Sequence, residues 1–508
     1  MTGLSPIDYR LMLPMVELTI FALGLLLIDL WIPPEWKWLN ATGAFIGVLF
    51  SALCVWQIQA ILPPRGQIGF YNSLLVDRFA IYFWYLFLAA AALTILGSSR
   101  YLDIENEHRG EYYALLLISV VGMMCMAAGI DIVLMFVGLE LTLIPAYLLF
   151  GFRGRHGKEK ENHARAREAV RKFVFHGLFS SAIFAYGLSL LYGFSGSTNL
   201  AHIVRALGAV NPRDPVVIIA LLTTITGLLS KIAAVPLHRW APAASETALT
   251  TISGYILSLG MAAAWVLFLR IVVFGMLPLR AVYAPVLTVV AIATLTLATV
   301  AALMQTNTKR LLAYSAIVHT GYILLSFSVI GSERIASPAF FDALKAMLIY
   351  LPVLTLMNLG AFLVIAALRQ GAVLGDDLAD LTGLFDRSPF VAVTMLIFLF
   401  SLAGIPPAAG YLGKYYIFRS LVESGHRSLA AAGVVFSLLG LLYYWKIAKP
   451  IFTRQPQPNP PLPVSLGMRS TLAITALATL VIGVYPRPLI TLVSWVLGIA
   501  QATHVAGK

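Results

Sequence analysis

A lysine, a proline and a histidine stand close together at the end of a long apolar run. Within Gly227–Trp240, Pro236 follows Lys231 by five residues and His238 comes two residues later. A charged side chain in the middle of a bilayer costs about 2.5–3.5 kcal/mol on insertion scales. A proline also removes a helical hydrogen bond, here the one to the carbonyl of Ile232. Two titratable groups beside a broken helix predict a hydrated path through protein, along which protons can move.

A buried carboxylate lies in another apolar run, Val137–Pro145. Glu140 precedes the proline of this run by the same spacing that separates Lys231 from its own proline. A carboxylate in such a place needs a proton or a positively charged partner. Lys231 and Lys172 are both candidate partners. The alternative is a static ion pair that only fixes helix packing.

A similar device occurs in the second half of the chain. The stretch Ser401–Lys414 contains two consecutive prolines, Pro406 and Pro407, and ends in a lysine. The prolines leave the carbonyls of Leu402 and Ala403 without their usual helical partners. Two interrupted helices, each with an embedded lysine, are typical of inverted repeats that carry a site at each break.

The composition predicts an all-α polytopic membrane protein. Of the 508 residues, 59% are hydrophobic and 11% are charged, whereas a soluble domain has about 25% charged residues. Apolar runs of roughly 17–25 residues can span a bilayer. We expect about fourteen such helices, at 12–32, 41–62, 76–98, 112–129, 131–151, 172–194, 215–236, 248–274, 281–304, 311–331, 346–368, 388–416, 428–452 and 469–498.

The helices group into four segments. Residues 1–110 form an N-terminal three-helix segment, and 111–274 form a first repeat of helices four to eight. Residues 279–452 form a second repeat of helices nine to thirteen, and 453–508 contain helix fourteen. Because each repeat has an odd number of helices, we expect consecutive copies to have opposite orientations in the membrane.

Histidines in apolar helices have two interpretations. His319 lies about ten residues into a helix that begins near Lys309 and Arg310. It is either a satisfied core residue or a proton relay, because an imidazole titrates near neutral pH and can both donate and accept a proton. His176 has the same ambiguity.

Basic residues crowd into a few loops. Eight of them fall in the segment Arg153–Lys172, which the positive-inside rule places in the cytoplasm. Both termini are then expected on the outer side of a bacterial plasma (inner) membrane, which is the periplasmic side in a Gram-negative cell. The segment is either a topology anchor or a docking surface for an acidic partner. The net charge of +12 therefore indicates membrane topology and not nucleic-acid binding.

No cofactor or metal site is expected in this chain. The two cysteines, Cys54 and Cys125, lie in apolar runs, without the spacing of a metal site or disulfide framework. The sequence has no glycine-rich phosphate loop and no cysteine cluster for iron–sulfur. The embedded charges are the chemistry that remains.

The chain resembles the antiporter-like membrane subunits of respiratory complex I, and within that family it is most similar to subunit N of the bacterial enzymes. The motifs that carry the resemblance are "GLELTLIP", "SKIAAVPLHRWAP", "QTNTKRLLAYSAIVHTGYILL", "MNLGAFLVI" and "LAGIPPAAGYLGKYYIF". The resemblance covers nearly the whole chain. It implies fourteen helices in two inverted units, and proton pumping driven by quinone reduction elsewhere in the complex.

The resemblance also implies roles and partners. The proton-transfer residues would be those that match the family motifs, namely Glu140, Lys172, Lys231, His238, His319 and Lys414. NADH, FMN, iron–sulfur clusters and quinone would bind other subunits of the complex. The neighbours in the membrane would be lipid, the antiporter-like subunits M and L, and small membrane subunits.

One position departs from the family pattern. Where the family usually has a lysine in helix eight, this chain has Met261, which cannot carry a proton. Either His238 and water take over the lateral transfer, or pumping by this chain is impaired. Two alternatives therefore stand beside a proton-translocating subunit: a subunit of a multisubunit Na⁺/H⁺ antiporter, and a non-pumping structural subunit.

Overall fold

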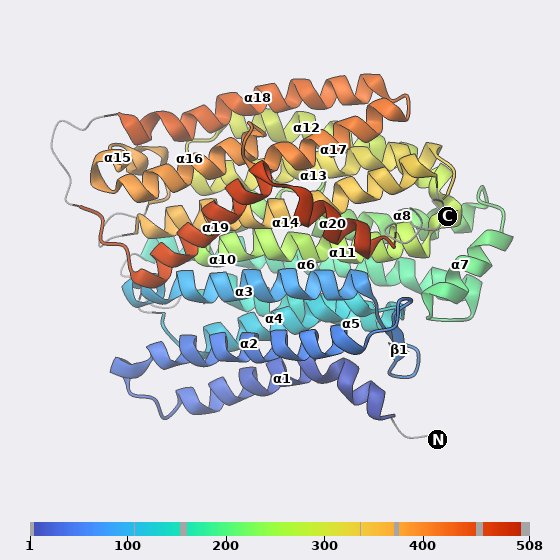
Figure 1. Cartoon of the computed structure of the whole chain (residues 1–508), viewed down its shortest axis with the longest axis horizontal. Helices are drawn as coiled ribbons and strands as arrows, with labels where there is room; N and C mark the ends of the chain where they lie inside the picture. Colours follow the sequence, from blue (N-terminus) through green and yellow to red (C-terminus); the bar gives the residue numbers. More distant parts are fainter. Residues whose placement is uncertain are drawn as a thin grey trace. The chain divides into compact units, whose positions relative to one another are not determined.

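The computed structural model describes residues 5–105, 107–152, 160–335, 337–369, 375–453 and 461–498. As predicted, these residues are mainly helical. The strands among them are β1 (Gln67–Gly69) and β2 (Leu74–Val76), which pair antiparallel. The chain divides into two compact units, and the long helices of each run side by side (Figure 1).

The first unit comprises Met1–Ser99, Asn106–Lys231 and Leu259–Arg280. Its closest helix pairs are α4 with α5, α6 with α8, and α1 with α4 and α2. The helices of this unit, including the part of α3 up to Ser99, are α1 (Pro6–Asp29), α2 (Trp38–Ile61), α3 (Arg78–Glu105), α4 (Gly110–Ala128), α5 (Ile132–Phe150), α6 (Lys160–Ser195), α7 (Leu200–Ala209), α8 (Pro215–Lys231), α11 (Met261–Phe268) and the π-helical η4 (Leu269–Gly275).

A helix cap and one ion pair hold elements of the first unit in place. Asp131 caps the start of α5 by accepting from the amide of Val133 at 2.8 Å. Arg270, on η4, forms two hydrogen bonds to Asp77 at 3.0 and 2.6 Å and a third to the carbonyl of Ala127. The contacts of Arg270 therefore join η4 to the start of α3 and to the last turn of α4.

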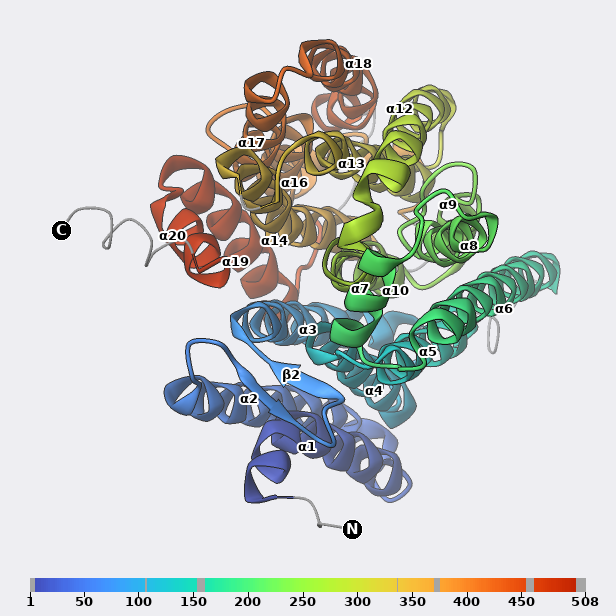
Figure 2. The same cartoon turned by 90° about the vertical axis from the view of Figure 1, so that its right-hand side faces the viewer.

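The second unit comprises Arg100–Glu105, Ile232–Ser258 and Ala281–Lys508. Helix α14 packs against α13, α17, α16, α10 and α19, which can be followed end-on in Figure 2. The helices are α9 (Trp240–Thr247), α10 (Thr250–Tyr255), α12 (Arg280–Met304), α13 (Thr308–Ser332), α14 (Pro338–Ala367), α15 (Leu384–Arg387), α16 (Pro389–Ala403), α17 (Ala409–Glu423), α18 (Arg427–Phe452), α19 (Leu466–Val484) and α20 (Arg487–Val496).

Three of the predicted spans are shorter or interrupted helices. The helix predicted at 215–236 ends at Lys231, the helix predicted at 388–416 is divided between α16 and α17, and the helix predicted at 469–498 is divided between α19 and α20. Twelve helices in the described ranges are long and apolar enough to cross a membrane. The count of fourteen and the two inverted repeats stay predictions.

The predicted span 248–274 is helical but irregular. It is divided into α10, the π-helical η3 (Ile256–Gly260), α11 and η4. A π-helical turn changes the register between the faces of a helix, and such turns are frequent at functional sites. The narrow predicted division between helices four and five is confirmed, because α4 ends at Ala128 and α5 begins at Ile132.

Candidate functional site

Lys231 is the last residue of α8 and is held by neutral oxygens. Its side chain is buried, and its ammonium donates to the carbonyl of Gly177 at 3.0 Å and to the hydroxyl of Ser181 at 2.9 Å. Both partners lie on α6. A cation at a helix C-terminus also meets the negative end of the helix dipole. The end of the helix and the neighbouring α6 thus solvate a charge that the bilayer would not.

Close packing of α6 and α8 makes this contact possible. A Cβ atom at Gly227 would lie 2.8 Å from the Cα atom of Phe184, and a Cβ atom at Gly177 would collide with the ring of Tyr147. Glycine at 227 lets α8 approach α6, and glycine at 177 lets α6 approach Tyr147 on α5. The lysine can therefore reach the backbone carbonyl of the adjacent helix.

Glu140 interacts with Lys231 through charge and not through a direct ion pair. The carboxylate lies within electrostatic range of both Lys231 and the hydroxyl of Tyr147. No ion pair within 4.0 Å joins Glu140 to a lysine in the residues that the structure describes. One carboxylate oxygen of Glu140 is buried without a hydrogen-bond partner in the same part of the chain.

Lys172, the other candidate partner, lies elsewhere. Its ammonium pairs with Glu168 at 2.6 Å, one turn away on α6, and 70% of its side chain is exposed. The structure therefore does not bring Lys172 to Glu140. Of the basic segment Arg153–Lys172, residues 153–159 lie outside the described residues.

The backbone break predicted after Lys231 is present in the second unit. The orphan carbonyl of Ile232 accepts a hydrogen bond from the hydroxyl of Thr320 at 3.0 Å, and the amide of Val235 donates to Thr294 at 3.1 Å. Ala233 has φ +53°, in the left-handed region, which costs roughly 1–2 kcal/mol for a residue with a Cβ atom. Side chains from α12 and α13 therefore hold the strained turn in place.

His238 follows the break and is half-buried. Its ring centroid lies 6.2 Å from that of Tyr314 on α13. The histidine thus lies beside the interrupted backbone, as expected from the sequence.

Lys414 occupies the corresponding break in the second half of the chain. Its buried ammonium donates to the carbonyls of Leu402 and Ala403 at 3.0 and 2.9 Å and to the hydroxyl of Ser437 at 3.0 Å. These are the two carbonyls that the prolines were predicted to deprive of partners. The ammonium also lies 4.9 Å from the ring centroid of Tyr322, at cation–π distance. Lys414, on the neighbouring α17, thus supplies the hydrogen-bond donor for the last carbonyls of α16.

His319 lies in a cluster of tyrosines, one of which, Tyr322, also contacts Lys414. Its Nδ1 is 2.5 Å from the hydroxyl of Tyr350, and its Nε2 is 3.2 Å from the hydroxyl of Tyr444. The ring also contacts that of Tyr322, three residues on along α13. Sequence reasoning missed these tyrosines. The spacing of His319 and Tyr322 on one helix face was the available signal.

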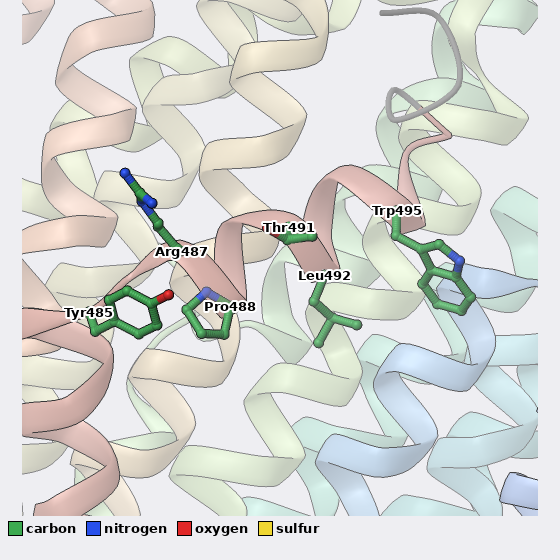
Figure 3. Close-up of a pocket in the computed structure, with 6 residues that line it drawn as sticks. All are labelled: Tyr485, Arg487, Pro488, Thr491, Leu492 and Trp495. Atoms are coloured by element: carbon green, nitrogen blue, oxygen red, sulfur yellow. The ribbon is translucent and has the colours of Figure 1, made fainter. Parts of the chain in front are cut away.

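Met261 is buried at the start of α11, directly after η3. Its thioether offers no proton, so α11 contributes no titratable group at this position. No group of three metal-ligating side chains occurs within the described ranges. A surface pocket is lined by Tyr485, Pro488, Leu492 and Trp495 on or beside α20, with Arg487 directed away from Leu492 (Figure 3). The pocket contains none of the residues discussed above.

Comparisons with known proteins agree with the resemblance. Residues 129–440 match the family described as NADH:quinone oxidoreductase/Mrp antiporter, TM. The chain is 47% identical to NADH-quinone oxidoreductase subunit N 1 of Koribacter versatilis, over 99% of this chain and 98% of that protein. It is 42% identical to subunit N 2 of Solibacter usitatus, over 96% of both.

A solved structure has the same fold. The chain superposes on a chain of respiratory complex I from Thermus thermophilus with bound aureothin, with a TM-score of 0.76 and 25% identity. The match covers 94% of this chain and 98% of the other.

Proposed function

The chain belongs to the family of NADH:quinone oxidoreductase and Mrp antiporter transmembrane subunits, and we propose that it is the proton-translocating subunit N of a bacterial complex I-type enzyme. The observation that carries the proposal is the pair of buried lysines. Lys231 and Lys414 each lie at an interrupted helix, held by neutral oxygens. A lysine in such a site can exchange its proton without breaking an ion pair.

The proposed mechanism is electrostatic. A lysine near a carboxylate holds its proton more firmly than a lysine in an apolar site. A change in the charge of Glu140, driven by quinone reduction elsewhere in the complex, would change the proton occupancy of Lys231. A change of about 1.4 kcal/mol in this interaction shifts the proton equilibrium tenfold, so small movements are sufficient. Lys172, which is paired with Glu168, contributes to this electrostatic mechanism through its charge near the surface.

Lateral transfer completes the proposed cycle. Because Met261 replaces the lysine that the family usually carries, we assign the step after Lys231 to His238 and water at the helix break. Lys414 is the proposed acceptor, and His319 with its tyrosines is the proposed relay beside it.

The subunit's place in the complex follows from the same proposal. The chain performs no redox step, and NADH, FMN, iron–sulfur clusters and quinone bind other subunits. Its membrane neighbours are the antiporter-like subunits M and L and small membrane subunits. The segment Arg153–Lys172 faces the cytoplasm, and both termini face the outer side of the bacterial inner membrane.

Substitution of Lys231 tests the pumping role. Lys231→Met is expected to abolish NADH-driven proton pumping by the reconstituted complex while the complex still assembles. Lys446→Met is the matched control, because Lys446 also donates to two backbone carbonyls, of Leu303 and Gln305 at 2.8 and 3.0 Å, and has no proposed proton. Unchanged pumping by the Lys231→Met complex would exclude the role.

The family description also supports a second candidate function, a subunit of a multisubunit Na⁺/H⁺ antiporter. Purification from native membranes distinguishes the two. Co-migration with flavin and iron–sulfur proteins is the result expected for a complex I-type subunit. Co-migration with small membrane proteins alone, without a redox centre, would favour the antiporter.

A further inference from the structure

A row of polar side chains runs along one face of α6 toward Lys231. Glu168, Lys172, His176 and Ser180 follow one another at intervals of four residues. Residues four apart on a helix lie above one another, with a rise of about 6 Å per step. The side chains of Glu168 and Lys172 are 50% and 70% exposed, His176 is half-buried and Ser180 is buried. The row therefore leads from the surface into the first unit.

The inner end of the row meets the Lys231 site. His176 Nε2 is 2.8 Å from the hydroxyl of Ser230, the residue before Lys231. The carbonyl of Gly177 accepts from both Ser180, at 2.9 Å, and the ammonium of Lys231, at 3.0 Å. His176 and Gly177, on one turn of α6, thus contact the consecutive residues Ser230 and Lys231 at the end of α8.

The surroundings of the row leave one direction of access. Phe175, Leu178 and Phe179 on α6 are 51–67% exposed, and they give the outer face of this helix an apolar surface suited to lipid. The row itself reaches the charged beginning of the helix. Lys172 and Glu168 therefore lie between His176 and the start of α6, beside this apolar face.

We propose that this row is the proton inlet of the Lys231 site and that His176 is its proton-transfer group. The inference rests on the proposed pumping function. It adds a residue outside the set predicted from the sequence motifs. It also places uptake on the side of the membrane where α6 begins.

The transfer conserves protons at each step. The imidazole takes a proton at Nδ1 from water beside Lys172 and gives its Nε2 proton to the hydroxyl of Ser230. The hydroxyl passes its own proton through a water molecule to the neutral amine of Lys231. Water-assisted transfer of the proton from Nδ1 to Nε2 restores the starting tautomer. An imidazole suits this role because it both donates and accepts near neutral pH.

The charged and titratable groups near this path come from three helices. Glu168, Arg171 and Lys172 lie on α6 itself, and Lys231 lies on α8. Glu140 and Tyr147 lie on α5 and interact electrostatically with each other. The carboxylate of Glu140 attracts a proton toward the inner end of the row.

The test uses the whole complex in liposomes. His176→Gln keeps a hydrogen-bonding group for Ser230 but cannot carry a proton. The ratio of the proton-pumping rate to the quinone-reduction rate is measured from pH 6 to pH 8. We expect a loss of about tenfold at pH 8 and less than about twofold at pH 6, because a positioned acid–base group matters most when free protons are scarce. His202→Gln, at an exposed histidine of α7, is expected to match the unmodified complex.

Two further variants make the outcomes distinct. Ser230→Ala is expected to reproduce the pH-dependent loss, since it removes the hydroxyl that receives the proton. A loss by the same factor at every pH would indicate a packing role for His176, and wild-type pumping at pH 8 by both variants would overturn the inlet. Lys231→Met separates a failure of the proposed inlet from a failure of the proposed pumping function. If it abolishes pumping while His176→Gln does not lower it, the inlet is wrong and the pumping function stands.

Discussion

Thr320 is the side chain that completes the broken helix after Lys231, and Thr320→Val tests its contribution. Valine has nearly the same shape but no hydroxyl, so the carbonyl of Ile232 loses the hydrogen bond of 3.0 Å. Both residues are fully buried, and valine offers no donor in place of the hydroxyl. A buried polar group left unsatisfied costs about 1–3 kcal/mol. We expect the free energy of unfolding to fall by that amount, and pumping to fall with it as the break loses its shape.

Thr299→Val is the matched control. Thr299 lies on α12 in the same unit, is 1% exposed, and its hydroxyl is buried without a partner among the described residues. Removing such a hydroxyl is neutral or stabilising. Unfolding in mixed micelles measures both variants, and pumping by reconstituted complex measures the functional consequence. Equal stability of the Thr320→Val and Thr299→Val proteins would refute the reasoning.

Three further predictions follow from single contacts. Asp77→Asn should lower the free energy of unfolding by about 2–3 kcal/mol, because the buried guanidinium of Arg270 loses its counter-charge; a change under 0.5 kcal/mol in micelle unfolding would contradict this. Gly404→Ala should lower pumping, because Gly404 has φ +84° and a Cβ atom there would lie 2.8 Å from Lys414 Cδ; normal pumping would show that the position of Lys414 is not critical. Tyr350→Phe should slow pumping by removing a hydrogen bond of His319, and a loss of stability without a loss of pumping would make His319 a core residue.

The backbone breaks were predictable from the sequence because proline chemistry is local. Pro406 and Pro407 identified the carbonyls of Leu402 and Ala403, and Pro236 identified that of Ile232, before any contact was known. The structure supplies a donor for each of the three. The prediction of a mainly helical membrane protein is also confirmed. It was possible because composition and the length of the apolar runs are sufficient to predict this class of protein.

The partners across helices were not predictable from one sequence. That Lys231 binds Gly177 and Ser181, and that Lys172 pairs with Glu168, depends on how α6 and α8 pack. Two of the tyrosines around His319, Tyr350 and Tyr444, come from separate helices, α14 and α18, and only tertiary structure brings them to the histidine. The predicted spans at 215–236 and 388–416 were too long because the apolar composition continues past the point where the helical backbone is interrupted.

Proton pumping by complex that carries Lys414→Met tests the central claim most directly. The measurement is the number of protons moved per NADH oxidised in sealed liposomes, with electron transfer followed in parallel and with uncoupler. If the two buried lysines carry the proton, pumping is lost, while the assembled complex retains the electron-transfer activity that the uncoupler reveals. Wild-type proton stoichiometry in this variant would contradict the account and identify the chain as a structural subunit of its complex.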